Sequence, residues 1–281
     1  MTQLAEFARC PRRHHLTRVL GLVEPAGLHG GATDDDPARA TSRGTLAHAM
    51  LAELELTAPP LAQRAQLAAV AGRRGYDPAD AGVVGIRDEV LRFLASPPGL
   101  RLAGAAAEGR LRRELPFLLR LDGEGEGAPA PCYLSGAIDA LVTPRPGGRL
   151  LVLDYKYSLP RAEAADRYRL QLAAYALAAS RASGGAPVEA RLQFLRGDFS
   201  GLDVTPSPEA LADFARAAPA LAAGVASGAG DRTPAELGRD EARCLGEGCG
   251  FVERCYRAGD APDRAPVEPG LAPPAGSGDP A

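Results

Sequence analysis

Two periodicities of hydrophobic positions divide the chain into a helical first part and a mixed second part. Leu46, Met50, Leu51 and Leu54 recur at helical spacing and predict a helix over residues 43–56. The same period predicts four more helical regions, at residues 2–20 with a break at Pro11, 61–98, 162–182 and 207–228.

Segments rich in apolar residues and bounded by turn-forming residues predict the strands. They lie at residues 109–121, 132–143, 148–158 and 187–196. Because helices precede these strands and also alternate with them, the expected fold class is α/β. The expected architecture is a central mixed sheet of four or more strands with helices on both sides.

Length, charge and hydropathy narrow the class of protein. The 281 residues, 46% of them apolar, can bury the core of one large domain or slightly more. A net charge of -3 argues against a protein that coats nucleic acid by bulk charge, but it leaves room for a local basic groove. The sequence has neither a run of 18 apolar residues nor a signal-peptide pattern, so we expect no membrane association and a cytoplasmic location. Residues 258–281 are predicted to be disordered.

Lys156 is the only lysine among the 32 lysine and arginine residues. Arginine serves as well as lysine on most solvated surfaces, but lysine is a compact charge whose pKa responds readily to burial and to neighbours. A single lysine in an arginine-rich chain therefore indicates either a site that needs such a donor or an accident of composition.

The hairpin around Lys156 predicts a pair of carboxylates. If the turn lies within residues 144–149, a symmetric register places Val152 opposite Leu141 and Asp154 opposite Asp139. Two carboxylates facing each other on apolar strands are costly unless a cation lies between them. Lys156 would project from the same face as Asp154, because the two are two residues apart.

Two aspartates with a lysine beside them suit metal-dependent phosphodiester hydrolysis. Mg²⁺ or Mn²⁺ prefers oxygen ligands, polarises a phosphoryl group and lowers the pKa of a bound water. The lysine could orient that water or offset the charge that develops in the transition state. The alternative is a buried Asp–Lys ion pair with a second, exposed aspartate, and the residues alone leave both interpretations open.

The segments "GAIDALV" and "LVLDYKYS" resemble the G-x-x-D and D-x-K strands of the PD-(D/E)xK nuclease superfamily, in its RecB-like branch. Four more segments resemble that branch in the same order: "ARCPRRHHLTRVLGL", "RGTLAHAMLAEL", "RELPFLL" and "QLAAYALAA". The resemblance covers residues 2–256 and implies a restriction-endonuclease-like core, with an N-terminal helical region folded over the active site. It implies a single nuclease domain over 1–257, made of a mainly helical part (1–105), an α/β catalytic core (106–228) and a cysteine segment (240–257).

The resemblance also implies the roles of individual residues. His48, Asp139 and Asp154 would be metal ligands, with the backbone carbonyl of Tyr155 as a further ligand. Lys156 would be the catalytic lysine. Glu114 stands at the position of the family's strand glutamate and would act through a water or a second metal.

Gln171 and Tyr175 are four residues apart and share one face of a helix. The resemblance implies that they lie beside the active site and position nucleic acid and the catalytic residues. Simple packing of a half-buried tyrosine is the alternative. Arg167 and Arg169 could add contacts to the nucleic-acid backbone.

Five cysteines, three of them close together near the C-terminus, are more typical of ligands than of a disulfide framework. The resemblance implies a [4Fe-4S] cluster held by Cys10, Cys244, Cys249 and Cys255. Structural Zn²⁺ held by four thiolates is the alternative. The interval from Cys244 to Cys249 is longer than the family's usual two-residue gap, which leaves the role of Cys244 open. Cys132 begins a strand and is expected to be a small core residue.

The function implied by the resemblance is metal-dependent cleavage of DNA, by an exonuclease acting on ends or single strands in repair and recombination. The sequence contains no G-x-x-x-x-G-K-[ST] motif, so a helicase would be a separate partner or part of a longer protein. Two alternatives stay open. One is a weakly active or inactive DNA-binding scaffold stabilised by an iron–sulfur cluster or zinc, and the other is a zinc-stabilised interaction module.

Overall fold

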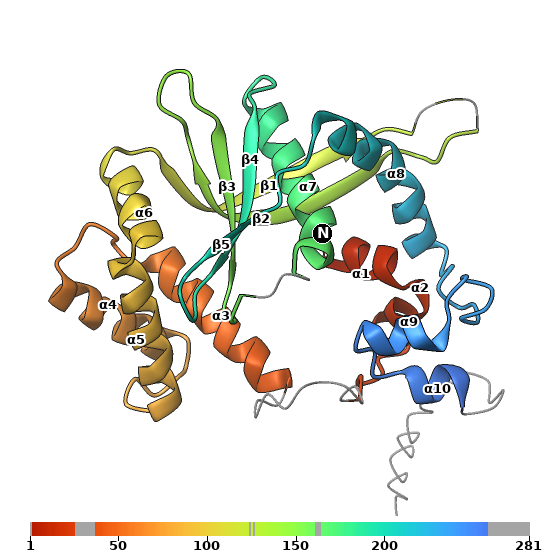
Figure 1. Cartoon of the computed structure of the whole chain (residues 1–281), viewed down its shortest axis with the longest axis horizontal. Helices are drawn as coiled ribbons and strands as arrows, with labels where there is room; N and C mark the ends of the chain where they lie inside the picture. The colour runs from red at the N-terminus through yellow and green to blue at the C-terminus, as the bar shows by residue number, and fades with distance from the viewer. Residues whose placement is uncertain (1, 26–36, 124, 126, 161–163, 258–281) are drawn as a thin grey trace, which may run out of the picture. The chain divides into compact units, whose positions relative to one another are not determined.

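The computed structural model describes residues 2–25, 37–123, 125, 127–160 and 164–257 (Figure 1). The chain divides into two compact units. The first unit comprises Met1–Arg9 and Ala32–Ser227, and the second comprises Cys10–Gly31 and Gly228–Ala281. The predicted disorder of residues 258–281 concerns a segment outside the described residues, and the single domain over 1–257 stays a prediction.

The first unit is built on a mixed sheet, which within the described residues has five strands. They are β1 (Leu111–Leu121), β2 (Cys132–Val142), β3 (Leu150–Lys156), β4 (Val188–Phe194) and β5 (Gly201–Asp203), and they lie side by side in this order. Only β3 and β4 pair in parallel, and the other neighbouring strands are antiparallel. Four of the strands were predicted from the sequence. The fifth was missed because β5 has three residues, too few for an alternating pattern.

The hairpin of β2 and β3 has the predicted register. Leu141 pairs with Val152, and the last pair in this direction is Ala140 with Leu153. Asp139 and Asp154 follow at the next position on each strand. The apolar alternation on both strands fixes this register, because a slip of one residue would turn every buried side chain to the other face.

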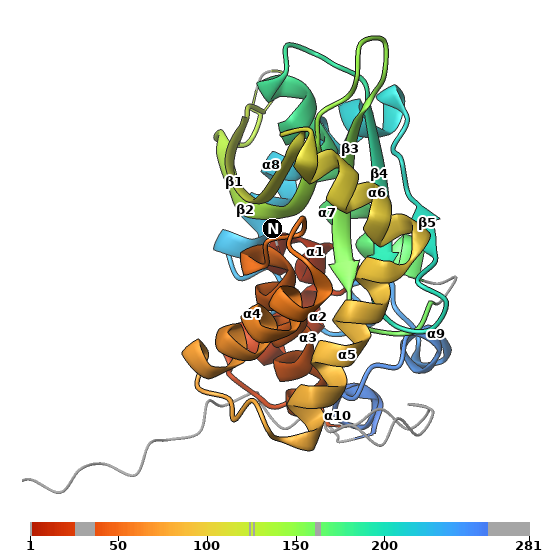
Figure 2. The same ribbon diagram turned by 90° about the vertical axis from the view of Figure 1, so that its left-hand side faces the viewer.

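Helices cover both faces of the sheet, as predicted (Figures 1 and 2). The crossover helix α7 (Ala164–Ala182) connects β3 to β4 and buries an alanine-rich face against them. Two further helices, α1 (Thr2–Arg9) and α8 (Pro208–Ala226), pack against α7. The opposite layer consists of α3 (Pro37–Glu53), α4 (Pro60–Arg73), α5 (Ala81–Ala95) and α6 (Pro97–Ala107).

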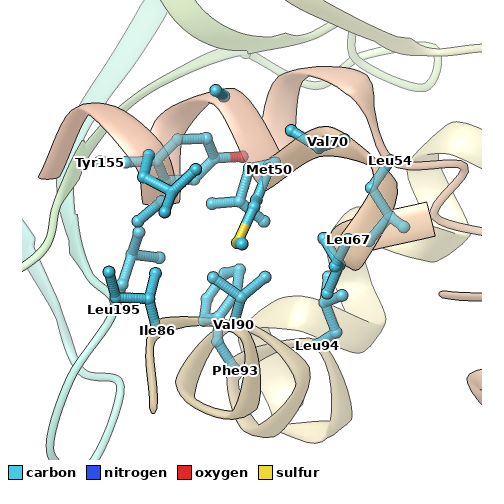
Figure 3. Packing of buried hydrophobic residues seen from close by; sticks show 14 of the residues in the cluster. Met50, Leu54, Leu67, Val70, Ile86, Val90, Phe93, Leu94, Tyr155 and Leu195 are labelled. Carbon is cyan, nitrogen blue, oxygen red and sulfur yellow. The ribbon is translucent and has the colours of Figure 1, made fainter. Parts of the chain in front are cut away.

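The strand β3 contributes to both cores because its side chains alternate. Leu150 and Val152 join the cluster under α7. Leu153 and Tyr155 join the cluster of the opposite layer, which also contains Met50 of α3 and Phe93 of α5. Figure 3 shows Tyr155 in this cluster. Residues at even positions of β3 therefore face α7, and this places Asp154 and Lys156 on the α7 side.

Helix α6 extends beyond the predicted helical region, which ended at residue 98. Its first residues are Pro97 and Pro98, and a proline pair suggests the end of a helix when the sequence is read alone. Proline also suits the first turn of a helix, where the missing amide would have no partner inside the helix. Here the prolines begin a new helix that runs to Ala107.

The second unit contains only short helical elements within the described residues. They are α2 (Pro11–His14), the π-helical turn η1 (His15–Val19), α9 (Glu241–Gly246) and α10 (Val252–Tyr256). The predicted break at Pro11 separates α1 from α2. In the described ranges, no helix of either unit is long and apolar enough to cross a membrane.

Candidate active site

Asp139 and Asp154 are both buried, and each lies one residue beyond the last pair of β2 and β3, Ala140 with Leu153. Asp154 is 1% exposed and Asp139 is 8% exposed. The alternative interpretation of the sequence, an ion pair with a second and exposed aspartate, is therefore wrong about that exposure. Two buried carboxyl groups this close need hydrogen bonds, cations or protonation to be stable.

Lys156 is on the predicted side of the strand, and its Nζ lies 2.5 Å from Oδ2 of Asp154. The other carboxylate oxygen of Asp154 accepts a hydrogen bond of 3.0 Å from Nε2 of Gln171. The same nitrogen lies 2.8 Å from the hydroxyl of Tyr175. Both oxygens of Asp154 are therefore held by neighbouring side chains, one from β3 and one from α7.

Steric crowding explains why glycine occupies position 136, the first residue of "GAIDALV". The ring of Phe117 on β1 lies over Gly136, and a Cβ atom built at Gly136 would stand 2.9 Å from that ring. Phe117 in turn packs edge to face on Tyr175, with ring centroids 5.6 Å apart. A side chain at position 136 would push Phe117 against Tyr175, the neighbour of Gln171.

Asp139 contacts the backbone of β3 and helix α3. Its Oδ2 accepts a hydrogen bond of 2.6 Å from the backbone amide of Tyr155. His48, which α3 carries, places Nδ1 3.5 Å from the same oxygen and Nε2 2.9 Å from the carbonyl oxygen of Tyr155. Because a carbonyl only accepts hydrogen bonds, Nε2 donates in this contact.

Glu114 reaches the same place from β1. The pairs on either side of it, Arg113 with Ala140 and Leu115 with Ile138, place Glu114 at the position opposite Asp139. Its φ of 46° lies in the left-handed region, which a residue with a side chain rarely adopts. Such strain costs on the order of 1–3 kcal/mol and is found most often at functional sites.

One group of potential metal ligands stands out among the described residues. Ligand atoms of His48, Glu114 and Asp139 all lie within 4.8 Å of one another. Of the predicted metal ligands, the structure thus brings His48, Asp139 and the Tyr155 carbonyl together, with Glu114. Asp154 is not part of this group, and its two carboxylate oxygens contact Lys156 and Gln171.

The electrostatics of the group favour its neutral forms in the absence of a cation. Burial, followed by the negative charge of Asp154, raises the pKa of Asp139 to about 8. Burial also raises the pKa of Glu114 and lowers the pKa of His48. A divalent cation among these atoms would reverse the effect on the carboxyl groups, because it favours their charged forms.

The donor set fits a hard divalent cation. It combines carboxylate oxygens, a backbone carbonyl and a histidine nitrogen that is neutral because of its lowered pKa. An ion bound by Nε2 of His48 would displace the proton that this nitrogen donates to the Tyr155 carbonyl. The 2.9 Å between the two atoms is close to the spacing of about 3 Å between neighbouring ligands of an octahedral ion with bonds of about 2.1 Å. His48, Asp139, Glu114 and the Tyr155 carbonyl are thus the groups that could hold such an ion.

Tyr168 was missed by the sequence analysis. Nζ of Lys156 lies 3.9 Å from the centroid of its ring. The available signal was the spacing of Tyr168, Gln171 and Tyr175, which stand three and four residues apart along one face of α7. Two arginines were predicted to contact the nucleic-acid backbone. The guanidinium carbon of Arg167 lies 5.5 Å from the centroid of the Tyr168 ring, and Arg169 is paired with Asp166 on the surface.

The second unit brings all four predicted cluster ligands to one pocket. Cys10, Cys244, Cys249 and Cys255 line it, together with Arg12, Arg13, Pro234, Arg239, Phe251, Val252 and Tyr256. Cys244, whose spacing left its role open, is therefore among its lining residues. Burial raises the pKa of Cys249, and it raises the pKa of Cys255 to about 11. Thiolates at these positions thus need a compensating cation.

Contacts within the N-terminal segment of this unit, and between it and the C-terminal segment, support this pocket. Sγ of Cys10 accepts a hydrogen bond of 3.4 Å from the amide of Arg13, and Glu24 binds both Arg13 and the amide of Gly250. A Cβ atom at Gly250 would lie 1.8 Å from the carbonyl oxygen of Pro25, so only glycine fits there. Cys132, by contrast, is half-buried on β2 at the edge of the first unit's core, as predicted.

Comparison with known proteins identifies the family. Residues 1–256 match the model of the PD-(D/E)XK nuclease superfamily. Curated proteins gave no match. Among solved structures, the chain resembles SSO0001, with 16% identity and a TM-score of 0.35 over 74% of this chain and 84% of that chain. It also resembles a candidate exonuclease from Eubacterium rectale, with 10% identity and a TM-score of 0.46 over 81% of this chain and 79% of that chain.

The family match spans both the β2–β3 hairpin and the cysteine segment. The mixed sheet with helices on both faces and additional N-terminal helices is a restriction-endonuclease-like α/β fold. The chain therefore belongs to the PD-(D/E)XK nuclease superfamily.

Proposed function

We propose that this chain is a Mg²⁺- or Mn²⁺-dependent deoxyribonuclease of the RecB-like branch, an exonuclease that acts on DNA ends or single strands. The observation that carries this proposal is the group of His48, Glu114 and Asp139 beside the buried pair of Asp154 and Lys156. Membership of a nuclease superfamily supports the reaction class, and the donor set supports the choice of metal.

The ion would be held by His48, Asp139 and the Tyr155 carbonyl, with Glu114 binding it directly or acting through a water or a second ion. Asp154 would join them as a further ligand once the ion draws one oxygen of its carboxylate away from Lys156 or Gln171. When bound, it polarises the scissile phosphoryl group and lowers the pKa of the attacking water. Asp139 would lose its proton as the ion enters, because its pKa of about 8 keeps it protonated near neutral pH.

Lys156 would stabilise the transition state of the cleavage step. Its ammonium group would donate a hydrogen bond to the attacking water or to a phosphate oxygen and offset the negative charge of the transition state. The P–O bond to the leaving deoxyribose oxygen would break as the bond from water to phosphorus forms, with the proton of the attacking water passing to solvent and a solvent water protonating the leaving oxygen. Gln171 holds Asp154 for this step, and Tyr175 lies within hydrogen-bonding distance of Gln171.

The resemblance to the RecB-like branch also supports three finer parts of the proposal. The substrate would be DNA rather than RNA, the process would be repair and recombination, and the location would be the cytoplasm. A helicase, either as a separate protein or as part of a longer chain, would supply the single strands. We also propose that the two compact units act together as one nuclease domain over residues 1–257.

The test is cleavage of end-labelled single- and double-stranded DNA by anaerobically purified protein with Mg²⁺ or Mn²⁺. Lys156→Ala and Asp154→Ala are each expected to lower the rate by a factor on the order of 10² to 10³. Asp213→Ala is the matched control, because this aspartate is exposed on α8 and paired only with its neighbour Arg216 in the described contacts. Wild-type protein that binds DNA but cuts neither substrate would favour the inactive scaffold instead.

The cysteine pocket supports a second proposal, a [4Fe-4S] cluster with Cys10, Cys244, Cys249 and Cys255 as ligands. Four thiols in one pocket match the four ligands of such a cluster, and Arg12, Arg13 and Arg239 would offset its negative charge. Iron and sulfide analysis of anaerobically purified protein tests it, together with visible absorption. About one zinc per chain in a colourless protein would favour the structural zinc site.

We propose a structural role for the cluster. It would connect Cys10 to a segment that begins 234 residues later, and crosslinks over long loops stabilise proteins by restricting the unfolded chain. Loss of one ligand should therefore loosen the second unit before it alters the chemistry of the first.

A further inference from the structure

Lys156 is held from two sides. Its Nζ is 2.5 Å from Oδ2 of Asp154 on its own strand and 3.9 Å from the ring centroid of Tyr168 on α7. The lysine side chain as a whole is 17% exposed, so most of it is shielded from water. An ammonium group over an aromatic face is attracted by the negative charge of the ring face, and the attraction grows when the group is desolvated.

The contact belongs to a row of side chains on α7. Tyr168, Gln171 and Tyr175 follow one another along the face that packs against β3 and β4. Gln171 donates to Asp154, and Tyr168 covers Lys156. One helix therefore contacts both functional groups of the "DYK" strand, each through a different side chain.

This arrangement deals with the flexibility of lysine. A lysine side chain has four rotatable bonds, and its ammonium group can take many positions unless contacts select one. The ion pair with Asp154 fixes a distance but leaves directions open, because an ammonium group has no planar geometry. The ring of Tyr168 removes the directions it occupies and leaves fewer for the ammonium hydrogens.

We propose that Tyr168 is a positioning residue that holds the ammonium group of Lys156 in place through its ring face. This inference rests on the proposed function, since it concerns the lysine assigned to catalysis there. It is the aromatic ring, and not the hydroxyl, that carries the role. Phenylalanine should therefore replace Tyr168, and an aliphatic residue of similar volume should not.

Packing alone is the competing explanation for Tyr168. The residue is half-buried and packs against the hydrophobic cluster under α7. A packing role predicts that Tyr168→Leu changes stability without altering the environment of Lys156. The readout must therefore report on the lysine itself.

The chain offers such a readout because Lys156 is its only lysine. Protein labelled with ¹³C,¹⁵N-lysine gives a single set of lysine signals by NMR. The ring current of Tyr168 should move the ε-methylene signals of Lys156 upfield in the wild type and in Tyr168→Phe. Tyr168→Leu should lose this shift, whereas Tyr133→Leu, at an exposed position on β2, should keep it. Lysine signals that are equal in the wild type and in Tyr168→Leu would overturn the contact.

Kinetics of DNA cleavage tests the consequence of the contact. Tyr168→Leu should lower kcat by about 3- to 30-fold with little change in KM, and Tyr168→Phe should stay within about twofold of the wild type. Unchanged kcat in Tyr168→Leu, or an equal loss in Tyr168→Phe, would overturn the positioning role. A wild type that cleaves no DNA would overturn the proposed function, while the NMR shift would still decide whether the ring holds the lysine.

A variant that keeps the shape of the ring covers the case in which Tyr168→Leu does not fold. Pentafluorophenylalanine at position 168 has an aromatic ring of nearly the same size whose face is no longer negative. It should lower kcat as Tyr168→Leu does while leaving the unfolding temperature close to that of Tyr168→Phe. A kcat equal to that of Tyr168→Phe would show that the ring acts by packing and would overturn the proposal.

Discussion

The carboxylates and the lysine of the first unit stand on sheet strands, whereas the cysteines of the second unit stand on short helices and the segments between them. Asp139, Asp154 and Lys156 belong to β2 and β3, which are each paired on both sides. Cys10, Cys244 and Cys255 belong to elements of four to six residues or precede one. Short helices are marginal in water without tertiary contacts. The first site is therefore held by its fold, and the second is expected to be held by its ligand.

The two sites also differ in how their ionisable groups affect stability. The first site buries two carboxyl groups, and burial, followed by the negative charge of Asp154, raises the pKa of Asp139 to about 8. The hydrogen bonds of the sheet maintain that arrangement at a cost in stability. The second site gathers thiols whose burial disfavours thiolates, so a cation would supply stability there. Substitutions should consequently have opposite effects on stability at the two sites.

The largest expected effect is the loss of a cysteine. Cys249→Ala should lower the stability of the second unit by several kcal/mol in anaerobically purified protein, because it removes a ligand of the proposed cluster. Calorimetry and hydrogen exchange of the amides in α2, α9 and α10 measure this. The matched control is Cys132→Ala on β2, which should cost about 1 kcal/mol and leave those amides protected. Equal protection in Cys249→Ala and in the wild type would refute the role of the ligand.

Asp139→Asn should raise the stability of the folded protein, whereas Cys249→Ala should lower it. The folded-state pKa of Asp139 lies above its ordinary value near 3.9. Between about pH 4 and 8 the carboxyl is ionised in the unfolded chain but still protonated in the folded protein, so the wild type loses stability as the pH rises through this range. Asparagine cannot ionise and can still accept the hydrogen bond from the Tyr155 amide.

Metal-free Asp139→Asn should therefore match the wild type near pH 4 and exceed it by on the order of 2 to 4 kcal/mol at pH 8. Urea unfolding in the presence of a chelator, at several pH values, measures the difference. A gain that shrinks with rising pH would contradict the raised pKa. Asp139→Asn should also be inactive in DNA cleavage, because it lacks a charged ligand.

Gln171→Leu should act on rate more than on stability. Asp154 would lose the hydrogen bond from α7 that orients its carboxylate, and such losses typically cost about 10- to 100-fold. Steady-state cleavage kinetics measure the fall in kcat. Gln66→Leu is the control, because Gln66 accepts a hydrogen bond from the Glu55 amide at the surface. An equal kcat in both variants would remove Gln171 from the site.

The smallest expected effect concerns the hydroxyl of Tyr155. It is buried against the α3–α5 layer and has no hydrogen-bond partner among the described residues, although its backbone atoms contact Asp139 and His48. Tyr155→Phe should be neutral or stabilising by about 1 kcal/mol, because it removes a polar atom that burial has separated from water. Thermal unfolding measures this, and a clear loss of stability would reveal a partner for the hydroxyl.

The sequence predicted most of the first unit because its signals are local. Alternating apolar residues and a short turn determine the β2–β3 hairpin, and the pairing of Leu141 with Val152 follows from them. Helix α6 was shortened in the prediction because its proline pair looked like a stop and in fact begins the helix. The strand β5 and the helices α9 and α10 are too short to show a period.

The candidate site was predictable in its members but not in its contacts. Two-residue spacing placed Lys156 beside Asp154, and the family resemblance pointed to His48 and Glu114. The spacing of Tyr168, Gln171 and Tyr175 places them on one face of α7, but the contact of Tyr168 with Lys156 also depends on how α7 lies on β3. The roles of these residues as metal ligands and catalysts stay predictions until they are measured.

The most direct test of the proposed chemistry is DNA cleavage by Lys156→Arg, measured beside the wild type with Mn²⁺ in anaerobically purified protein. Arginine keeps the positive charge and matches the residue used at every other basic position apart from histidine in this chain. We expect the wild type to cleave end-labelled DNA and Lys156→Arg to cleave it at least about 100-fold more slowly, with Mn²⁺ affinity unchanged, because a planar guanidinium cannot replace the compact ammonium group beside Asp154 and Tyr168. Cleavage by Lys156→Arg at the wild-type rate would contradict the assignment of the chemistry to Lys156.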